Sequence, residues 1–255
     1  MMINRTAIYV LWLREMKRFW RAKSRLVGAL AMPLFFLAFL GLGFNKMVIP
    51  GMSRDVNYIR FIIPGIIGMS LLFSSTFAGL SVLWDREFGF LKEIMVAPVS
   101  RVSIVLGRIA GGTTTALIQG ILIIGISLFM GFRIQSLGML LLSIVFMILI
   151  AMCFIGMGLI FASKMKDMQG FSIVMNFVIF PLFFLSGALY PLENFPLWIR
   201  YISRIDPLTY GVDGLRAVMI GVSSFSLFSN FVILIIFCLV MIFLGAYFFE
   251  KSESL

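Results

Sequence analysis

The sequence predicts an all-α integral membrane protein with six transmembrane helices. Its 255 residues are 61% hydrophobic and only 13% charged, with a mean hydropathy of +1.08, whereas soluble domains are about 45–50% apolar and about 25% charged. The apolar residues gather in six uncharged runs, each long enough to cross a bilayer core of about 30 Å as a helix. The runs lack the polar–apolar alternation of barrel strands, so helices must satisfy their backbone groups in lipid.

Residues 1–25, which precede the first span, predict an amphipathic helix in the inner headgroup layer. At helical spacing, one face holds Tyr9, Leu13, Met16 and Trp20. Another face holds Arg14, Arg18, Arg21 and Arg25. Aromatic residues on one face and basic residues on another are typical of interfacial helices. The alternative is that the segment is only a basic flank of the first span.

The six spans are expected at 26–45, 61–84, 109–132, 137–162, 168–190 and 225–249, followed by a tail at 250–255. With the N-terminus inside, the inner segments hold 14 of the 21 Lys and Arg residues and the outer segments hold 7. Because cytoplasmic loops carry an excess of these residues, both termini are expected in the cytoplasm, and the chain in the inner (cytoplasmic) membrane. The net charge of +10 then reflects this sorting and not nucleic-acid binding.

Residues 85–98 form the longest charged inner segment between spans and predict a short helix that projects from the membrane. Phe88, Leu91 and Met95 form an apolar ridge, and Pro98 ends the helix. An apolar ridge with a charged rim fits a groove on a partner protein. A hairpin loop on the membrane surface explains the same pattern.

The outer segment 194–220 is too apolar for a free loop and predicts two short helices. Asp206 caps the second helix, Pro207 suits its first position, and Gly221 ends it. One face of the first helix holds Trp198, Tyr201, Ile202 and Ile205, and one face of the second holds Leu208, Val212, Leu215 and Met219. The two helices either dip into the outer leaflet or lie flat on its surface.

Few residues are suited to chemistry. The sequence has no His, and none of the six runs holds an Asp, Glu, Lys or Arg between its ends, whereas ion-coupled transporters keep such groups near the membrane midplane. There is no GxxxxGK[ST] phosphate loop, and Cys153 and Cys238 are isolated in apolar runs. We therefore expect no catalytic residue, no metal site and no cofactor in this chain, so transport would need a separate motor.

Mild polar side chains inside the spans are candidates for lining a translocation route: Ser74, Ser75, Thr76, Thr113, Thr114, Thr115, Gln119, Asn176 and Ser186. Such residues also bond helix to helix, and this alternative stays open. Gly107 and Gly111 form a GxxxG pattern that permits close helix packing. The uncharged spans favour an amphipathic or apolar cargo, such as a drug, a lipid or a lipid-linked glycan.

Two segments resemble the type-2 ABC-transporter permeases, the membrane subunits of ATP-driven exporters. One is REFGFLKEIMVAPVSR at 86–101, and the other is LSGALYPLENFPLWIRYISRIDPLTYGVDGLRAVMIG at 185–221. The resemblance covers essentially the whole chain and is closest to the drug-resistance and nodulation-factor export branch. The sequence departs from the family at Phe90, where many relatives have Thr.

The resemblance implies an export permease that works as a homodimer, or as a heterodimer with a close relative. Two ATPase chains would bind ATP and Mg, and each would contact a coupling helix through Arg86, Glu87, Gly89, Phe90, Leu91, Lys92 and Glu93. The outer re-entrant motif would comprise Asp206, Pro207, Tyr210, Asp213 and Arg216. The rival functions are a transporter or channel that works without an ATPase, and a membrane scaffold without a transport role.

Overall fold

The computed structural model describes residues 4–44, 57–89, 99–133 and 136–252, and in these ranges the chain is helical, without β-strands. Five stretches of the described chain are helices long and apolar enough to cross a membrane. They are α3 with α4 (Tyr58–Ala78 and Leu80–Glu87), α6 (Arg101–Phe129), α7 (Leu137–Lys164), α8 (Met168–Leu185) and α11 (Leu227–Ser252). The predicted class, an all-helical protein with several apolar helices, is confirmed.

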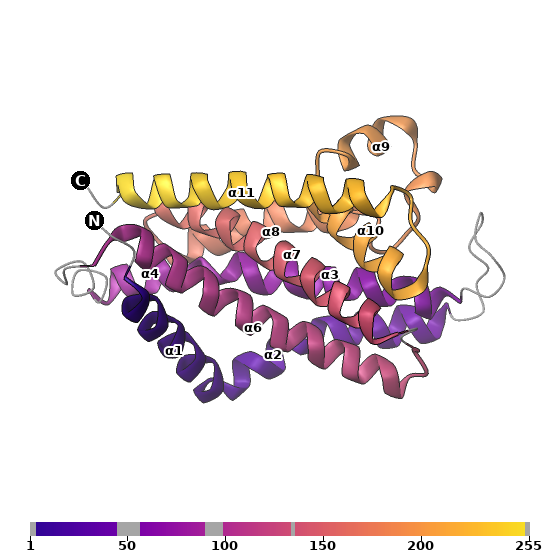
Figure 1. Ribbon diagram of the computed structural model, residues 1–255, viewed down its shortest axis with the longest axis horizontal. Helices are drawn as coiled ribbons and strands as arrows, with labels where there is room; N and C mark the ends of the chain where they lie inside the picture. The colour runs from indigo at the N-terminus through magenta and orange to yellow at the C-terminus, as the bar shows by residue number, and fades with distance from the viewer. Residues whose placement is uncertain (1–3, 45–56, 90–98, 134–135, 253–255) are drawn as a thin grey trace.

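Side-chain caps fix where three of these helices begin. Ser100, Ser136 and Asp167 precede α6, α7 and α8, and each accepts a hydrogen bond from the backbone N–H three residues further on. Such a cap satisfies one of the four N–H groups that the first helical turn leaves unpaired. Figure 1 shows the two ends of the chain at the same end of the bundle as α4 and the start of α6. Which end faces the cytoplasm stays a prediction.

The first expected span is built differently from the other five. α2 (Lys23–Phe36) contains Pro33 and passes directly into a π-helix, η1 (Leu37–Leu42). Pro33 has no backbone N–H to donate, so the helix loses one of its hydrogen bonds there. The apolar part, Val27–Gly41, is shorter than the helices named above. A sixth crossing of the membrane by this segment therefore stays a prediction.

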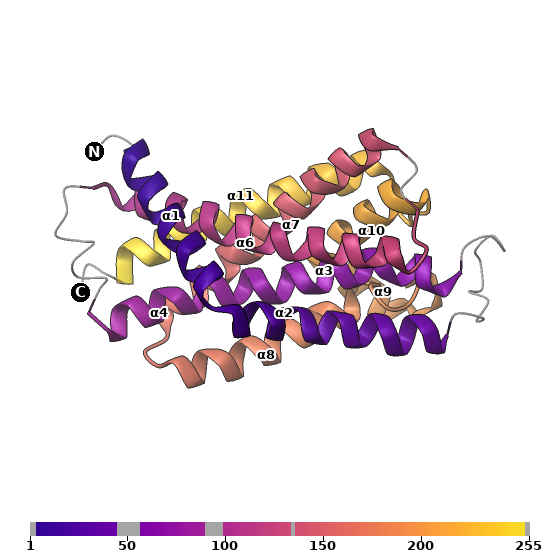
Figure 2. The ribbon, with the colours of Figure 1, turned by 90° about the horizontal axis from the view of Figure 1, so that it is seen from below.

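The helix α7 packs against α11, α3, α6 and a shorter helix, α10 (Pro207–Ile220) (Figure 2). Phe146 and Phe154 of α7 are fully buried. The junction between α3 and α4 approaches α7 so closely that a Cβ on Gly79 would lie 2.5 Å from the carbonyl oxygen of Gly158. Small residues permit such backbone contact between apolar helices.

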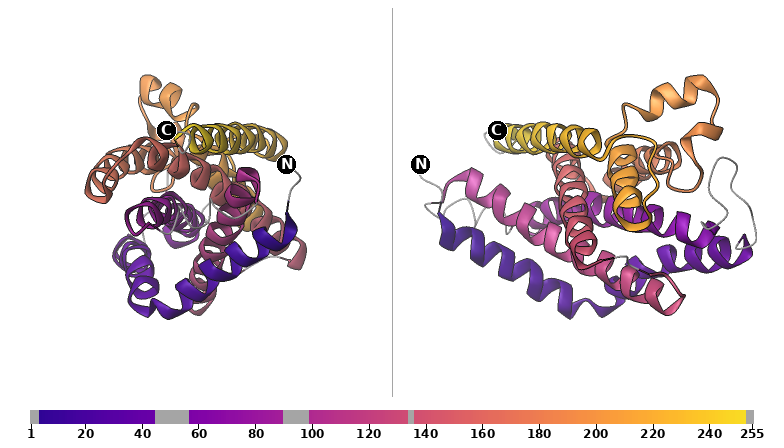
Figure 3. Two further views of the ribbon diagram at one scale, coloured as in Figure 1. Left: turned by 90° about the vertical axis from the view of Figure 1, so that its left-hand side faces the viewer. Right: turned by 45° about the vertical axis from the view of Figure 1, so that its right-hand side comes forward.

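The two predicted outer helices form, but they lie in different environments. α10 begins after the cap Asp206 with Pro207 at its first position and ends at Gly221, as the sequence predicts. Its apolar face is buried against α3 and α7. α9 (Leu197–Ser203) instead stands out from the bundle (Figure 3), and Trp198 and Tyr201 are about two-thirds exposed. Whether the two helices dip into the outer leaflet or lie flat on it stays a prediction.

The helix expected at 85–98 does not begin at residue 85. Asp85, Arg86 and Glu87 are the last turn of α4, and Phe88 caps that helix. Gly89 then has a φ of +74°, a left-handed conformation that glycine adopts at little cost. The rest of the expected helix, residues 90–98, lies outside the described residues.

The predicted N-terminal helix forms as α1 (Arg5–Arg21) and packs along α6 (Figure 2), and its place in the inner headgroup layer stays a prediction. Met16 is buried, whereas Tyr9 and Trp20 are 58% and 63% exposed. The buried face instead carries Leu11 and Phe19. Which face of α1 is buried depends on the helix that packs against it. The spacing of apolar residues in α1 alone does not predict burial of the face that α6 covers.

Candidate functional site

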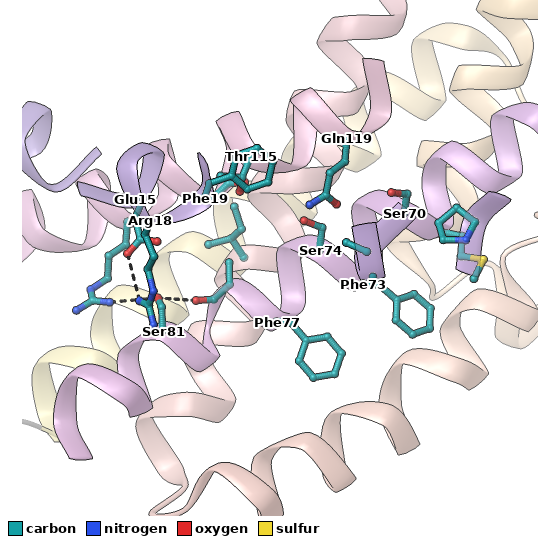
Figure 4. A pocket seen from close by; sticks show the side chains of 18 of the residues that line it. Glu15, Arg18, Phe19, Ser70, Phe73, Ser74, Phe77, Ser81, Thr115 and Gln119 are labelled. Carbon is teal, nitrogen blue, oxygen red and sulfur yellow. Dashed lines mark hydrogen bonds and ion pairs between the residues drawn. The ribbon is translucent and has the colours of Figure 1, made fainter. Parts of the chain in front are cut away.

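A cavity of about 420 Å³ lies between α1, α2, α3 and α6 (Figure 4). Two stripes of residues line it, each at the i, i+4, i+7, i+11 spacing of one helix face. The stripe on α3 and α4 is Ser70, Ser74, Phe77 and Ser81, and the stripe on α6 is Arg108, Gly112, Thr115 and Gln119. Hydroxyl and amide groups from two helices therefore point into the same space, and in Figure 4 Ser74 and Gln119 face each other across it.

The remaining walls of the cavity are apolar. They come from α1, α2, α3 and α7 and include Phe19, Met32, Phe73, Ile155 and Leu159. At one end of the cavity lie the charged side chains of Glu15, Arg18 and Arg108. The cavity is thus amphipathic along its length, and its volume falls within the range of about 300–1,000 Å³ typical of small-molecule sites.

The helix α1 reaches the cavity because two glycines of α6 admit it. A Cβ on Gly107 would lie 2.8 Å from Cβ of Leu11, and a Cβ on Gly111 would lie 2.8 Å from Cβ of Glu15. The indole Nε1 of Trp12 also donates a hydrogen bond to Oγ1 of Thr114 at 3.0 Å. The GxxxG pattern of α6 therefore packs against the N-terminal helix and places its charged side chains at the cavity.

Asp85 of α4 joins three elements at the charged end of the cavity. Arg108 donates from Nη2 to Oδ2 of Asp85 at 2.8 Å and from Nη1 to Oγ of Ser81 at 3.3 Å. Arg14 of α1 donates to the other carboxylate oxygen of Asp85. Asp85 and Arg108 are each only 6% exposed. Neither charge could be buried alone without a large desolvation cost, so the two residues depend on each other.

This ion pair lies at the margins of two uncharged runs and not within them. The uncharged runs are as predicted, but α6 begins at Arg101, so Arg108 lies about two turns inside the helix. Asp85 lies in the continuation of α3 through α4. Residues at the margins of the runs are therefore buried in the bundle where they meet a partner of opposite charge.

The sequence was compared with protein-family models and with known proteins. Residues 6–220 match the model of the ABC-2 type transporter family. The chain belongs to this family. The inner membrane transport permease YadH of Escherichia coli K12 is 30% identical over 235 residues, which are 91% of this chain and 90% of YadH. Nodulation protein J of Rhizobium meliloti is 29% identical over 202 residues, which are 78% of this chain and 76% of that protein.

A third relative is the ycf38 transport permease of Pyropia yezoensis, which is 32% identical over 201 residues. Those residues are 77% of this chain and 68% of the ycf38 protein. The family predicted from segments 86–101 and 185–221 is therefore confirmed, and the protein is an ABC-2 transport permease of the membrane.

The ABC-2 permease places three of its nine predicted pathway residues in the cavity. They are Ser74, Thr115 and Gln119. Thr114 donates to the carbonyl oxygen of Ala110 at 2.8 Å and accepts from Trp12, so it bonds helix to helix. Thr113 is buried in α6 but does not line the cavity, and Asn176 is exposed on α8.

The predicted ATPase contacts lie beside the Asp85 cluster in the permease. Arg86 donates from Nη1 to the carbonyl oxygen of Met165, just after the end of α7, at 3.2 Å. Glu87 ends α4, and Gly89 follows in the turn. Phe90, Leu91, Lys92 and Glu93 lie outside the described residues.

The predicted outer motif fastens α10 to its neighbours at the other end of the permease. Asp206 accepts from the backbone N–H of Leu208 at 2.9 Å, and Pro207 follows it in the first turn. The hydroxyl of Tyr210 donates to the carbonyl oxygen of Arg204 at 2.8 Å. The remaining members of the motif, Asp213 and Arg216, are 1% and 3% exposed.

Both buried charges of α10 have polar or aromatic partners. Asp213 accepts hydrogen bonds from the backbone N–H groups of Ser224 and Phe225 at 2.8 and 3.0 Å, and from Nδ2 of Asn230 at 2.7 Å. Arg216 donates to the carbonyl oxygen of Gly187 at 2.9 Å and lies 3.9 Å above the ring of Phe61. These contacts give the motif a role in holding the fold.

Sequence reasoning missed Ser70 and Arg108 as lining residues. Each lies on a helix face with other polar residues four or more positions away, and this periodicity was a usable signal. It was obscured because Arg108 belongs to a basic flank by composition, and because a single serine in an apolar run usually bonds its own backbone. Among the described residues there is also no group of three or more Cys, Asp or Glu side chains that could hold a metal ion.

Proposed function

We propose that this ABC-2 permease is the membrane subunit of an ATP-driven exporter and that a separate ABC ATPase supplies the energy. Two permease copies would pair, as a homodimer or with a close relative, and each would bind one ATPase chain carrying ATP and Mg. The cargo class that we propose is amphipathic or apolar: a drug, a lipid or a lipid-linked glycan. The location would be the inner membrane, with both termini in the cytoplasm.

The observation that carries the proposal is the contact of Asp85 with Arg14 and Arg108. Asp85 lies in the last turn of α4, immediately before the segment that resembles the family's coupling helix. Its partners lie on α1 and α6, the helices that flank the charged end of the cavity. Movement of the coupling segment by an ATPase would therefore be passed to two walls of the cavity through a single buried carboxylate.

The position of α1 supports the same proposal. Its packing on Gly107 and Gly111 holds it along α6 at the end of the bundle where α4 ends and α6 begins (Figure 1). There the exposed basic side chains of Lys17 and Arg21 suit contact with anionic headgroups or with a partner protein. The outer helix α9, with its exposed aromatic residues, lies at the opposite end.

The test uses the full-length tagged permease purified from the membranes of its own host. We expect an ABC ATPase to co-purify and, in proteoliposomes, to hydrolyse ATP faster with the permease than alone. The double variant Leu91→Ala, Glu93→Ala should lose most of this stimulation because it removes predicted contacts of the coupling segment. The matched control is Leu227→Ala, Glu193→Ala, which makes the same chemical change in exposed residues near the other end of the bundle.

Two outcomes would overturn the proposal. In the first, an ion gradient drives substrate transport by the purified permease without any ATPase, as expected for a secondary transporter or channel. In the second, an ATPase binds but its turnover is the same with and without the permease, as expected for a scaffold. Full stimulation in the Leu91→Ala, Glu93→Ala variant would show that the coupling segment has been assigned wrongly.

A further inference from the structure

The cavity contains buried polar atoms that the described protein leaves without a partner. Ser70 and Gln119 are 3% and 5% exposed, and neither Oγ of Ser70 nor Oε1 of Gln119 has a hydrogen-bond partner among the described residues. Both side chains line the cavity. A buried polar atom without a partner costs free energy comparable to a lost hydrogen bond. These atoms are therefore suited to a guest molecule that brings its own uncharged hydrogen-bonding group.

The described residues place three guanidinium groups and two carboxylates at the charged end of the cavity. Arg14, Arg18 and Arg108 face Asp85 and Glu15 there. Asp85 is shared by Arg14 and Arg108, whereas Arg18 approaches Glu15 only at 3.9 Å, beyond hydrogen-bonding distance. Nε of Arg108 is also buried without a partner in the described chain. Guanidinium donors therefore remain for a negatively charged group.

The dimensions of the cavity set the spacing of these two features. Ser81 at the charged end and Ser70 at the other lie eleven positions apart on one continuous face, which at 1.5 Å per residue is about 16 Å. Between them, the rings of Phe73 and Phe77 and the side chain of Met69 form an apolar wall. A ligand that fills this space is elongated, with an apolar body between two polar ends.

We infer that the cavity binds an amphiphile that carries an anionic group at one end and an uncharged hydrogen-bonding group on an apolar chain. The anionic group lies at Arg18 and Arg108, the chain lies against Phe73 and Phe77, and the uncharged group meets Ser70 and Gln119. This inference concerns binding by the permease alone, so it does not depend on the ATPase-driven export proposed above.

The binding test uses the full-length permease in nanodiscs of zwitterionic lipid, with radiolabelled 12-hydroxydodecanoate as the probe. This molecule has a carboxylate and a hydroxyl at opposite ends of an apolar chain. Unlabelled dodecanoate should compete about fivefold less well because it leaves Ser70 and Gln119 unpaired, and dodecanol should compete at least tenfold less well because it lacks the anion. Acetate should not compete at these concentrations; acetate that competes as well as the probe would overturn the inference.

Single-residue variants test which side chains bind the anionic end of the ligand and which bind its hydroxyl end. Arg18→Gln should weaken binding of 12-hydroxydodecanoate about tenfold and leave that of dodecanol unchanged. The matched control, Arg21→Gln, removes the same charge from an exposed residue of α1 that does not line the cavity. Gln119→Leu should remove the advantage of the hydroxylated probe over dodecanoate. Equal losses in Arg18→Gln and Arg21→Gln would overturn the inference, because they would indicate general attraction of anions to a basic helix.

A cavity-filling variant tests whether the probe binds in the cavity or elsewhere on the permease. Ser74→Phe should abolish saturable binding, and Ser172→Phe on α8, outside the cavity, should not. The melting temperature of each variant shows that it remains folded. Saturable binding retained in folded Ser74→Phe would place the site elsewhere and overturn the inference. Repeating the assay with phosphatidylglycerol in the nanodisc identifies the source of the natural ligand: competition indicates a bilayer lipid, and its absence indicates a separate amphiphile.

Discussion

Asp85 and Asp213 are two buried carboxylates at opposite ends of the bundle, and their partners differ in kind (Figure 1). Asp213 is bound by two backbone N–H groups of the connection between α10 and α11 and by the side-chain amide of Asn230 in the first turn of α11. Asp85 is bound by the guanidinium groups of Arg14 and Arg108, which belong to helices distant in sequence.

Asp213 therefore fixes one connection in the chain, whereas Asp85 links three helices that can shift relative to one another. Backbone N–H groups move only with the chain, so Asp213 fastens the loop after α10 in one conformation. Long guanidinium side chains tolerate small shifts of their helices while they keep a carboxylate paired. The cluster at Asp85 also borders the cavity, whereas the described partners of Asp213 do not line it. We therefore expect changes at Asp213 to affect folding and changes at Asp85 to affect coupling as well.

The largest loss of stability is expected for Asp213→Ala. The change leaves two backbone N–H groups and Nδ2 of Asn230 buried without their acceptor. Because a hydrogen bond to a charged group contributes about 1.5–3 kcal/mol, the total loss should be at least about 3–5 kcal/mol. We expect the melting temperature in detergent to fall by roughly 10 °C.

The control for this variant is Asp167→Ala, which removes an exposed helix cap. Loss of such a cap costs about 1 kcal/mol, so its melting temperature should fall by only about 2–4 °C. Similar melting temperatures for the two variants would contradict the assignment of Asp213 as a buried junction.

A slightly smaller loss of stability, of about 3 kcal/mol, is expected for Asp85→Ala, because it leaves the buried cation of Arg108 uncompensated. Arg108 retains its bond to Ser81, and Arg14 is partly exposed to solvent. The double variant Asp85→Leu, Arg108→Met should recover most of the stability, since apolar residues often replace a buried ion pair without a net cost.

ATP turnover separates coupling from stability in these variants. If Asp85 links the coupling segment to α1 and α6, the double variant should melt close to the wild type yet stimulate its ATPase poorly. Recovery of both melting temperature and ATP turnover would show that the ion pair acts only in folding, and the contrast with Asp213 would then disappear.

The smallest loss of stability is expected at the contact between α1 and α6. In Gly111→Val the new side chain would collide with Glu15, because a Cβ at that position already lies 2.8 Å from Cβ of Glu15. Overpacking of this kind costs about 1–3 kcal/mol and should lower the melting temperature by about 5 °C. Gly125→Val is the matched control on the same helix, since nothing lies within 4 Å of its Cβ; an equal fall in both would locate the effect in helix propensity instead.

The sequence predicts single elements better than it predicts their surroundings. Asp206, Pro207 and Gly221 define the ends of α10 locally, and the structure has the helix at that place. The same reasoning treats α9 and α10 alike, although only α10 enters the bundle. For α1, spacing predicts the helix, but the burial of Leu11 depends on Gly107 of α6, about which the spacing within α1 contains no information.

The candidate site was the least predictable part of the protein. Of the predicted lining residues on α6, Thr115 and Gln119 reach the cavity but Thr113 and Thr114 do not, since which face of α6 turns inward depends on α3 and α1. The stripe at Ser70, Ser74 and Ser81 is recognisable as the lining of a cavity only because it faces the stripe on α6 in the folded chain. A periodic polar face indicates a partner or a cavity, but one sequence does not say which of the two.

What the sequence determined by itself is the helical membrane class and the place of the long helices. Long uncharged runs in lipid must satisfy every backbone group internally, so their structure follows from local composition. What only the tertiary structure decided is which charges are buried. Asp85 lies 71 residues from Arg14 and 23 from Arg108, and the cost of burying each charge is offset only when folding brings all of them together.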